Sequence, residues 1–473
     1  MRRDWKVSAG HFPKVYCPQH QVDSELSVIN TNSLLLTDLY MLTMLEGFYK
    51  QSLNGIASYE FFVRKLPESR GFLVAAGLEQ ALEYLEESRF TPQELEWLRH
   101  CGTFSREFVD HLAEWRFTGD VDAMPEGTVF FENEPILRVT APISQAQFVE
   151  SRLINLLNLQ TMIASKAARC VLVADRRTLV DFGLRRAHGA EAGLLASRAS
   201  YLAGFDGTAT VLAGMMFAIP IYGTMAHAYI QAHDSERAAF ETFARAQPGN
   251  VVLLIDTYDT EQGARVVADL APRLRDSGIT IKAVRLDSGD LAVHSRNVRK
   301  ILDDAGLKQI GIFCSGNLDE YRLRDLVQGG APINGFGVGT RLDTSEDAPS
   351  LECIYKLVEY DGQPRRKRSE GKATLPGRKQ VFRQYRDDGE METDVVTVWG
   401  DLQPGEPLLE PVVRQGRRVR AAEPLSTIRE RWAAQRGRLP SHLRALETYP
   451  PYPVRIAPAL EELAQRADES IVR

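Results

Sequence analysis

The sequence contains few cysteines and no long apolar run. Its five cysteines, among 473 residues, are odd in number and widely separated. This spacing fits neither a disulfide framework nor a zinc site, and it favours a reducing, cytoplasmic setting. The longest apolar region, Val211–Tyr222, is interrupted by Pro220 and is too short to span a membrane. No apolar stretch follows the two arginines at the N-terminus, so we expect no signal peptide.

Neither sign of charge dominates the sequence. The 57 Lys and Arg residues nearly balance the 63 Asp and Glu residues, for a net charge of −6. This balance argues against a dedicated nucleic-acid binder. The basic run Arg365–Arg368 has no aromatic stacking array beside it, which favours a solvated loop. We therefore expect neither a nucleic acid nor a membrane as a partner. The hydrophobic content of 44% is instead typical of a globular protein with a large core.

The pattern in residues 1–145 predicts a mixed α+β domain. Residues 1–30 show no clear period and are expected to form a loose arm. In Ile56–Leu66 apolar and polar residues alternate, which predicts a strand, and Phe117–Val139 is also rich in strand-forming residues. The expected helices of this domain are Leu34–Gln51, Gly71–Glu87 and Thr91–His100.

Residues 146–345 show a different rhythm. After a long helix predicted at Gln145–Val173, a short apolar strand recurs every ~30 residues with a helix between most strands, which is typical of parallel βαβ units. The predicted strands are Thr178–Phe182, Ile219–Gly223, Val251–Asp256, Ile281–Asp287, Ile310–Ser315 and Ile333–Val338. The expected helices include Thr260–Ser277, Ala292–Ala305 and Asp319–Gln328. Residues 346–473 return to strands and loops, and become helical from about Thr427. We expect this C-terminal segment to pack on the first domain.

Polar, charged or glycine residues follow the carboxyl end of every predicted parallel strand. These segments are Asp181–Arg186, Gly223–His227, Asp256–Asp259, Arg285–Asp290, Ser315–Asn317 and Gly335–Arg341. In α/β barrels and open parallel sheets, active sites are built at this edge. Six such strand ends, with a histidine and several Asp and Arg residues among them, predict a single active site there.

Two of these strand ends favour phosphate binding. Ser315-Gly316-Asn317 and Gly337-Val338-Gly339-Thr340 present backbone N–H groups, and they come last in the series, where barrels often bind phosphate. An ordinary strand-to-helix turn also favours glycine, and would explain either loop taken alone. Neither loop has the P-loop or dinucleotide-binding spacing.

His227 is the most suggestive of the nine histidines. It follows a predicted strand, precedes a helix, and lies among small residues. An isolated turn histidine is usually structural, so a catalytic role requires a carboxylate that orients the ring. Asp256, at the end of the next strand, is the natural candidate. His188 and His233 are weaker candidates, and no spacing typical of a zinc protease is present.

Taken together, several motifs between Thr37 and Arg383 resemble the nicotinate phosphoribosyltransferase family. They are Thr37–Tyr40, Pro125–Gly127 with Glu134-Pro135, Asp181–Arg186, Gly223–His227, Arg285–Asp290, Gly337–Thr340, and Gly371-Lys372 with Pro376–Lys379. The C-terminal cysteine cluster of some relatives is missing. The resemblance implies an irregular (β/α) barrel of the type II phosphoribosyltransferase kind, with a mixed α+β flanking domain from both chain ends. It also implies a homodimer with shared active sites.

The resemblance further implies a reaction and roles for individual residues. Nicotinate and phosphoribosyl pyrophosphate would give nicotinate mononucleotide and pyrophosphate, with ATP as co-substrate and Mg²⁺ as cofactor. His227 would be phosphorylated by ATP, Asp256 would orient its ring, and Asp287 would lie beside the ribose and a Mg²⁺ ion that no protein side chain binds directly. The phosphoribosyl and phosphate groups would contact Arg185, Ser315, Gly316, Asn317, Gly339, Thr340 and Lys356.

The family resemblance also implies a nicotinate pocket. Phe182 would cover one face of the pyridine ring, and Tyr40 of the neighbouring subunit the other. Arg285 and Thr224 would contact the carboxylate, since Arg can offer it two parallel hydrogen bonds. A relative that uses nicotinamide has an Asp where this sequence has Ala209. An Asp there would repel a carboxylate, so Ala209 favours the acid.

Other functions remain open at this point. The same fold could use nicotinamide, which Ala209 disfavours, or quinolinate, whose second carboxylate would require more cations. A barrel lyase or aldolase would need a Schiff-base lysine, and none of the strand ends has one. A non-catalytic binding protein would leave His227, Asp256, Arg285 and Asp287 unexplained.

Overall fold

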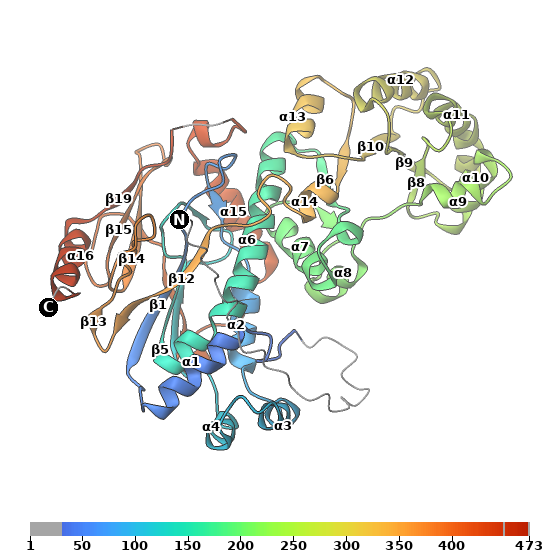
Figure 1. The fold of residues 1–473 in the computed structure, drawn as a ribbon. Helices are drawn as coiled ribbons and strands as arrows, with labels where there is room; N and C mark the ends of the chain where they lie inside the picture. Colours follow the sequence, from blue (N-terminus) through green and yellow to red (C-terminus); the bar gives the residue numbers. More distant parts are fainter. Residues whose placement is uncertain (1–30, 448–449, 472–473) are drawn as a thin grey trace, which may run out of the picture.

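The computed structural model describes residues 31–447 and 450–471, so the arm expected at residues 1–30 lies outside the described residues. The fold is α/β, and Figure 1 shows its parts arranged side by side. A four-stranded sheet lies on the left, a seven-stranded antiparallel sheet lies in the middle, and a parallel sheet with its helices extends to the right. The long helix α6 (Glu150–Val173) runs between the middle and the right-hand part.

The seven-stranded sheet combines strands from both ends of the chain. Strand β1 (Ile56–Val63) pairs on one side with β5 (Leu137–Pro142) and on the other with β12 (Cys353–Tyr360). β3 (Asp120–Ala123) likewise pairs with the late strand β17 (Glu410–Arg414). The remaining strands of the sheet are β13 (Gln363–Pro364) and β18 (Arg417–Arg418). Strands of the C-terminal segment therefore pair with strands of the N-terminal part in one sheet.

Strand β1 is buried on both faces, although its alternating sequence predicts one buried face. Tyr59, Phe61 and Val63 are in the core, and Glu60 on the opposite face is also fully buried. The Glu60 carboxylate lies 2.7 Å from Nζ of Lys379, at the start of β14 (Lys379–Tyr385), so a second sheet covers this face. That sheet also contains β15 (Met391–Val398), β16 (Glu406–Pro407) and β19 (Val454–Ile456).

The other elements of the flanking part are short. Two strands form a small antiparallel ribbon, β2 (Leu73–Val74) and β4 (Val129–Phe130). The helices are α1 (Leu39–Lys50), α2 (Leu78–Glu87), α3 (Pro92–His100), α4 (Arg106–Leu112), α5 (Ile143–Phe148), α15 (Leu425–Arg438) and α16 (Pro458–Ile471), with a 3₁₀ turn η3 (Ser441–Leu443). Helix α3 begins with a capping box in which Thr91 and Glu94 satisfy each other's backbone N–H groups.

The parallel sheet has the strand order β7-β6-β11-β10-β9-β8 and curls into half a barrel. Its strands are β6 (Thr178–Asp181), β7 (Gly207–Thr208), β8 (Val251–Leu254), β9 (Ile281–Leu286), β10 (Gly311–Ser315) and β11 (Gly335–Val338). The helices around it are η2 (Leu184–Arg186), α7 (Ala190–Leu202), α8 (Val211–Phe217), α9 (His227–Gln231), α10 (Glu236–Ala246), α11 (Thr260–Asp276), α12 (Leu291–Asp304), α13 (Glu320–Gln328) and α14 (Thr340–Asp343). The fold class expected from the sequence is thus confirmed.

Three local predictions are wrong. Ile219–Gly223 is not a strand and makes only one isolated bridge, between Ile221 and Thr208, because its side chains Ile221 and Tyr222 stay exposed and no sheet covers them. The helix predicted from Gly71 begins at Leu78, since Gly77 has a φ of +97° and the preceding residues form β2. The helix predicted at Gln145–Val173 is divided into α5 and α6 at Val149.

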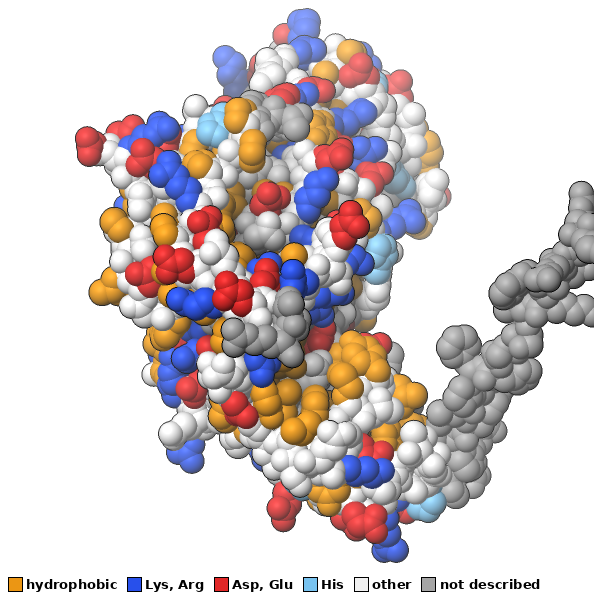
Figure 2. All heavy atoms as spheres, turned by 60° about the vertical axis from the view of Figure 1, so that its left-hand side comes forward, with side chains coloured by type: hydrophobic (Ala, Val, Ile, Leu, Met, Phe, Trp, Pro, Cys, Tyr) orange, Lys and Arg blue, Asp and Glu red, His pale blue; other side chains and the backbone are white. Residues whose placement is uncertain are grey.

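No described helix is both long and apolar enough to cross a membrane. On the face shown in Figure 2, acidic and basic side chains are interspersed and neither sign forms a broad field. The basic loop is partly held down, because Arg366 and Arg368 each lie 3.4 Å from the Asp468 carboxylate on α16. This contact makes the loop less solvated than the sequence predicts.

Candidate active site

Arg285, Asp287 and Ser315 are joined where strands β9 and β10 end. Arg285 donates from Nε to Ser315 Oγ at 2.8 Å and from Nη2 to Asp287 Oδ1 at 2.8 Å. Ser315 in turn donates to the same Asp287 oxygen. A third guanidinium N–H reaches the carbonyl of Met225 at 3.3 Å. The Arg285 side chain is thus fixed at three points: Ser315 on the neighbouring strand β10, Asp287 just after β9, and the Met225 carbonyl.

Asp287 is an ionised carboxylate at this edge. Its burial alone would raise its pKa, but the hydrogen bond from Ser315 and the charge of Arg285 outweigh that effect. His227 adds a smaller contribution in the same direction, so the pKa of Asp287 lies below its usual value. The site therefore keeps one negative charge close to His227 and Arg285 at neutral pH.

His227 is the first residue of α9, and its ring is held by Thr257 rather than by Asp256. Nδ1 of the ring lies 3.1 Å from Thr257 Oγ1. Asp256 Oδ2 instead accepts hydrogen bonds from the Asp287 N–H at 2.8 Å and from Ser288 Oγ at 2.6 Å. Asp256 and Thr257 follow the end of β8, and of these two neighbours it is Thr257 that bonds to the ring. The sequence-based pairing of Asp256 with the ring is thus corrected.

The aromatic ring of Phe182 faces Arg285. The guanidinium carbon lies 5.5 Å from the ring centroid, within the range of a cation–π contact. Gly337 makes this arrangement possible, because a Cβ there would lie 2.5 Å from the Phe182 ring. The Thr224 hydroxyl donates to the Val252 carbonyl at 2.6 Å, which leaves its lone pairs available to a ligand. Phe182 and Arg285 together offer a planar surface and a cation.

Both glycine loops come to the same edge of the sheet. Gly316 has a φ of +92° and a Cβ on it would lie 2.0 Å from the Asp287 carbonyl oxygen, so only glycine fits there. Asn317 also has a positive φ, of 50°. In the described part of the chain, no acceptor takes a hydrogen bond from the backbone N–H of Gly316, Asn317 or Gly339. The N-terminus of α13 is already capped by Asp319, so the loop rather than that helix end would receive an anion.

Tyr40 and Lys356 form a second group, away from the strand ends. Tyr40 lies on α1 and is 49% exposed, while Lys356 lies on β12 with Nζ 3.4 Å from Glu150 Oε1. Burial and then the charge of Glu150 raise the pKa of Tyr40, so the tyrosine and Glu150 are neighbours. Figure 1 shows α1 and β12 well apart from β8, β9 and β10. Within one chain, the predicted ligand-binding residues are therefore divided between two places.

Arg185 and Thr340 complete the predicted set. Arg185 lies in the exposed turn η2 directly after Phe182 and Gly183, and no described side chain pairs with it. Thr340 is the first residue of α14. Both therefore lie at the carboxyl ends of β6 and β11, which are adjacent strands.

The structure adds residues that the sequence reasoning missed. Thr257 lies next to Asp256 in a polar strand end, so its position gave a usable signal. Glu236 begins α10, and burial followed by repulsion from Asp259 and Asp256 raises its pKa to about 7. Asp343 is buried against Asp181 behind the strand ends. Neither Glu236 nor Asp343 stands in a recognisable motif. Each has an unusual pKa because the fold places it beside carboxylates from other segments of the chain.

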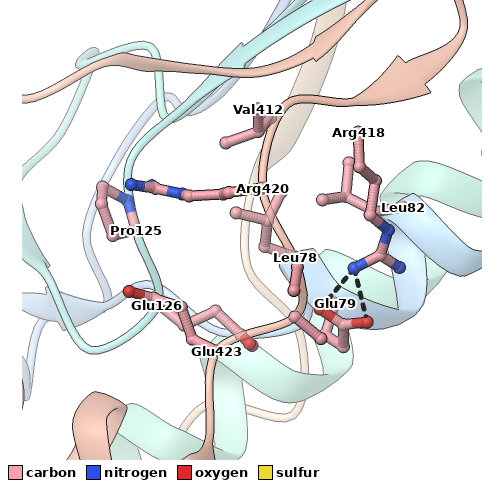
Figure 3. Close-up of a pocket in the computed structure, with 11 residues that line it drawn as sticks. Leu78, Glu79, Leu82, Pro125, Glu126, Val412, Arg418, Arg420 and Glu423 are labelled. Atoms are coloured by element: carbon pink, nitrogen blue, oxygen red, sulfur yellow. Dashed lines mark hydrogen bonds and ion pairs between the residues drawn. The ribbon is translucent and has the colours of Figure 1, made fainter.

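A hollow between α2, the turn at Pro125 and residues 412–423 lies in the flanking part (Figure 3). Its charged side chains already have partners within the chain. Arg418 is paired with Glu79, as the dashed lines in Figure 3 show, and Arg420 with Glu410. Glu126 is paired with Arg198. The hollow therefore offers no free charge to a ligand, unlike the strand ends.

In the described ranges, no three His, Cys, Asp or Glu side chains are grouped to hold a metal ion. Two carboxylate residues do come to the same strand ends, where Asp256 Oδ2 accepts from the Asp287 backbone N–H. Asp256 Oδ1 is buried and has no hydrogen-bond partner. A cation that keeps most of its water and shares phosphate ligands needs only one or two carboxylates, which these residues supply.

Comparisons with known proteins agree with this arrangement. Residues 35–158 match the nicotinate phosphoribosyltransferase N-terminal domain, and residues 177–371 match the nicotinate phosphoribosyltransferase family. A nicotinate phosphoribosyltransferase of Mycobacterium tuberculosis is 49% identical over 89% of this chain and 91% of its own length. That of Bacillus subtilis is 41% identical over 74% of this chain and 72% of its own. The human nicotinic acid phosphoribosyltransferase structure superposes with a TM-score of 0.82 at 29% identity, covering 91% of this chain and 99% of the human one.

Proposed function

Because the chain belongs to the nicotinate phosphoribosyltransferase family, we propose that it transfers a phosphoribosyl group from phosphoribosyl pyrophosphate to nicotinate. It is an enzyme, and its place is in NAD salvage. The products are nicotinate mononucleotide and pyrophosphate. The connected set of Phe182, Arg285, Asp287 and Ser315 at one sheet edge is the observation that carries this proposal, since it supplies a ring surface, a cation and an anion side by side. Neither nicotinamide nor quinolinate is favoured as substrate.

Phe182 and Arg285 suit the acid form of the pyridine. The nicotinate ring stacks on Phe182, while its carboxylate meets Arg285 and, once the Thr224 O–H turns from the Val252 carbonyl to the ligand, accepts a hydrogen bond from Thr224 as well. Arg285 is held at three points, so its orientation is fixed before the ligand arrives, which lowers the entropy lost on binding. The exposed Ala209 at the end of β7 adds no negative charge that would oppose the carboxylate.

The loops at Gly316 and Gly339 suit the phosphate of the phosphoribosyl group. Their free backbone N–H groups point to an anion-binding role, and Arg185 and Thr340 extend the same edge. When the bond from the ribose to pyrophosphate breaks, positive charge develops on the sugar carbon. The ionised Asp287 is the group of this chain that would lie beside that charge.

Mg²⁺ is part of the proposal as a cofactor. The carboxylates of Asp256 and Asp287 would hold it, mainly through its water molecules and the phosphates of the substrate. When bound, it neutralises charge on the departing pyrophosphate. The buried, unpartnered Oδ1 of Asp256 is the feature of this chain that fits such a cation.

His227 is proposed as the residue that ATP phosphorylates. Thr257 occupies Nδ1, which leaves Nε2 as the nitrogen open to phosphorylation. Nε2 attacks the γ-phosphorus of ATP, the bond to the bridging oxygen breaks, and ADP leaves. The phosphohistidine then adds negative charge near the pyrophosphate site and biases substrate binding and product release. Hydrolysis of the phosphohistidine restores the free ring.

We also propose a homodimer in which each active site uses both chains. The separation of Tyr40 from the strand ends within one chain supports this, since a second copy could present its own Tyr40 to the Phe182 pocket. Helix α8 supports it too, because Val211 is 70% and Met215 77% exposed. Such a cluster of exposed apolar side chains is typical of an interface. A cytoplasmic location belongs to the same proposal and is supported by the free cysteines of the described residues.

One experiment tests the proposed function. Purified protein with Mg²⁺, ATP and phosphoribosyl pyrophosphate is given nicotinate, nicotinamide or quinolinate, and nucleotide product, pyrophosphate and ADP are followed for wild type and His227→Ala. We expect product from nicotinate, and loss of ADP release in the variant. Product from nicotinamide or quinolinate alone would overturn the substrate assignment, and unchanged ADP release in His227→Ala would overturn the phosphohistidine.

A further inference from the structure

Two buried carboxyl groups face each other behind the strand ends. Asp181 is the last residue of β6 and Asp343 the last residue of α14, and they are 0% and 2% exposed. Both carboxylate oxygens of Asp181 accept hydrogen bonds. Oδ1 accepts from the Gly183 N–H at 2.8 Å, and Oδ2 accepts from Ser197 Oγ at 2.8 Å and Thr208 Oγ1 at 2.7 Å.

Asp343 has no such donors. Neither of its oxygens receives a hydrogen bond from any described N–H or hydroxyl group, and the group within its reach is the Asp181 carboxyl. Burial is the largest of the causes that raise the pKa of Asp343 well above its usual value, followed by the charge of Asp181 and their hydrogen bond. Burial, the lack of donors and the neighbouring carboxylate all favour the protonated form of Asp343, whose proton would then lie between it and Asp181.

No cation offsets the charge of this pair. The helices packed on α14 are η2, α7 and α6. The basic residues of these helices and of α14 itself are Arg152, Lys166, Arg169, Arg185, Arg186, Arg198 and Arg341, and the acidic residues of α6 and α7 are Glu150 and Glu191. Arg198 pairs with Glu126, Lys166 and Arg169 with Glu320, Arg152 with Glu191 and Arg341 with Asp319, and the two η2 arginines are exposed. In the described part of the chain, none of these side chains forms an ion pair with Asp181 or Asp343, so a shared proton would keep two negative charges from meeting there.

The pair lies between two segments of the proposed site. A Cβ on Gly183 would be 2.1 Å from Asp343 Cγ, so the carboxyl group packs directly against the turn after Phe182. The Phe182 N–H donates to the Val338 carbonyl at 2.8 Å, and a Cβ on Gly339 would lie 3.0 Å from the Phe182 carbonyl oxygen. The turn that carries Phe182 and Arg185 is thus back to back with the Gly339–Thr340 loop.

We propose that Asp343 is a positioning residue, which shares one proton with Asp181 and so holds the Phe182 turn in register with the Gly339–Thr340 loop. The role of the pair in catalysis rests on the proposed function, in which Phe182 binds nicotinate and the loop binds phosphate. Loss of the shared proton would push the two segments apart through charge repulsion, and both substrates would then bind less well. The proton stays within the pair and takes no part in the reaction.

The test compares Asp343→Asn with Asp343→Leu. An Asn amide can still donate to Asp181, whereas Leu has similar size and cannot donate. KM and kcat for nicotinate and phosphoribosyl pyrophosphate are measured from pH 6 to pH 9.5, and unfolding is followed for each variant. We expect Asp343→Leu to raise KM for nicotinate about tenfold, and Asp343→Asn to stay near wild type. We also expect wild-type KM to rise at alkaline pH, and that rise to be absent in Asp343→Asn.

A second buried carboxyl pair provides the matched control. Glu134 and Asp394 are both fully buried in the flanking part, and the charge of Asp394 helps burial to raise the pKa of Glu134. Glu134→Gln is expected to alter stability without changing the pH dependence of KM. If Asp343→Leu folds and keeps the wild-type KM for both substrates, or if Asp343→Asn keeps the alkaline rise, the positioning role is wrong.

Infrared difference spectroscopy makes the pair testable apart from activity. At neutral pH, wild type minus Asp343→Asn should show the carbonyl band of one protonated carboxylic acid. Its absence would overturn the shared proton. A band together with no nucleotide product from any pyridine would contradict the proposed function while leaving the proton pair intact.

Discussion

His227 and Thr257 are joined by a hydrogen bond of 3.1 Å between Nδ1 and Oγ1, and this bond sets the orientation of the histidine ring. The bond involves the end of β8 and the first residue of α9, so it fixes the ring relative to the sheet. It also leaves Nε2 as the nitrogen free to react. A residue that no motif marks thus determines how the central histidine is presented.

Replacing Thr257 with Val is expected to slow phosphorylation of His227 about fivefold, the effect of losing one hydrogen bond worth ~1 kcal/mol. The measurement is the rate of ADP release from ATP without nicotinate. Thr257→Ser keeps the hydroxyl and serves as the control, with a rate close to wild type. Equal rates for Thr257→Val and wild type would contradict the orienting role.

Replacing Arg285 with Lys is expected to lower kcat/KM for nicotinate about 100-fold. Lys keeps the positive charge but cannot make the three directed contacts to Ser315, Asp287 and Met225. Steady-state kinetics with varied nicotinate measure the loss. The same exchange at Arg273, exposed on α11, is the control and should leave kcat/KM within about twofold of wild type.

Replacing Ala209 with Asp is expected to raise KM for nicotinate about tenfold and to make nicotinamide a detectable substrate. The new carboxylate repels the nicotinate carboxylate and can accept a hydrogen bond from an amide. Ala209→Asn, which has the same size without the charge, should show a smaller rise in KM. A preference for nicotinate that survives in Ala209→Asp would show that this position does not decide between acid and amide.

Replacing Glu236 with Gln is expected to stabilise the fold at pH 8 and not at pH 4.5. Burial and the neighbouring Asp259 and Asp256 raise the pKa of Glu236 to about 7, above its value in the unfolded chain. Ionisation therefore opposes folding, and this penalty is absent below the unfolded pKa and complete above pH 7. Since the side chain is partly exposed, the gain is about 1 kcal/mol after solvent screening.

Urea unfolding at the two pH values measures the effect of Glu236→Gln. Glu241→Gln changes a half-buried carboxylate on the same helix, α10, that is paired with Arg245 one turn away, and it should alter the free energy of unfolding by less than about 0.5 kcal/mol at either pH. A gain for Glu236→Gln that is equal at pH 4.5 and pH 8 would exclude ionisation as its cause.

Replacing Met215 with Asp is expected to convert the proposed dimer to monomers and to abolish nicotinate turnover. Burying an apolar side chain of this size contributes ~1.5–3 kcal/mol, and a charge in its place opposes association. Light scattering on the eluting protein measures the mass. Leu402→Asp is the control, because Leu402 is 85% exposed in the flanking part and should leave the dimer intact. A dimeric Met215→Asp variant would exclude α8 from the interface.

The sequence predicts the local features of this protein well. Helices α11, α12 and α13 agree with their predicted ranges to within one residue, and five of the six predicted parallel strands are present. Helices and strands are indicated by the spacing of apolar residues and by turn residues within short segments, so the sequence of each segment is enough to predict them. The strand predicted at Ile219–Gly223 is absent, because an apolar run does not by itself reveal whether a sheet will pair with it.

The sequence predicts which residues belong to the site, but not which of them contact one another. The sequence places Phe182 and Asp287 at strand ends, because the edge of a parallel sheet collects whatever follows its strands. His227 instead follows a segment that makes one isolated bridge and no strand. It could not show that β6 lies beside β11, far along the chain, and this pairing is what brings Asp343 to Asp181. Nor could it choose Thr257 over Asp256 as the partner of His227.

The amino-acid sequence by itself thus determined the type of fold, the family and the residues available for chemistry, since these depend on local patterns and motifs. The tertiary structure alone decided which strands are neighbours, which side chain orients His227, and which carboxyl group must hold a proton. These last features depend on burial and on contacts between distant segments. A carboxylate's charge, in particular, is set by the donors around it, and only the folded chain brings those donors together.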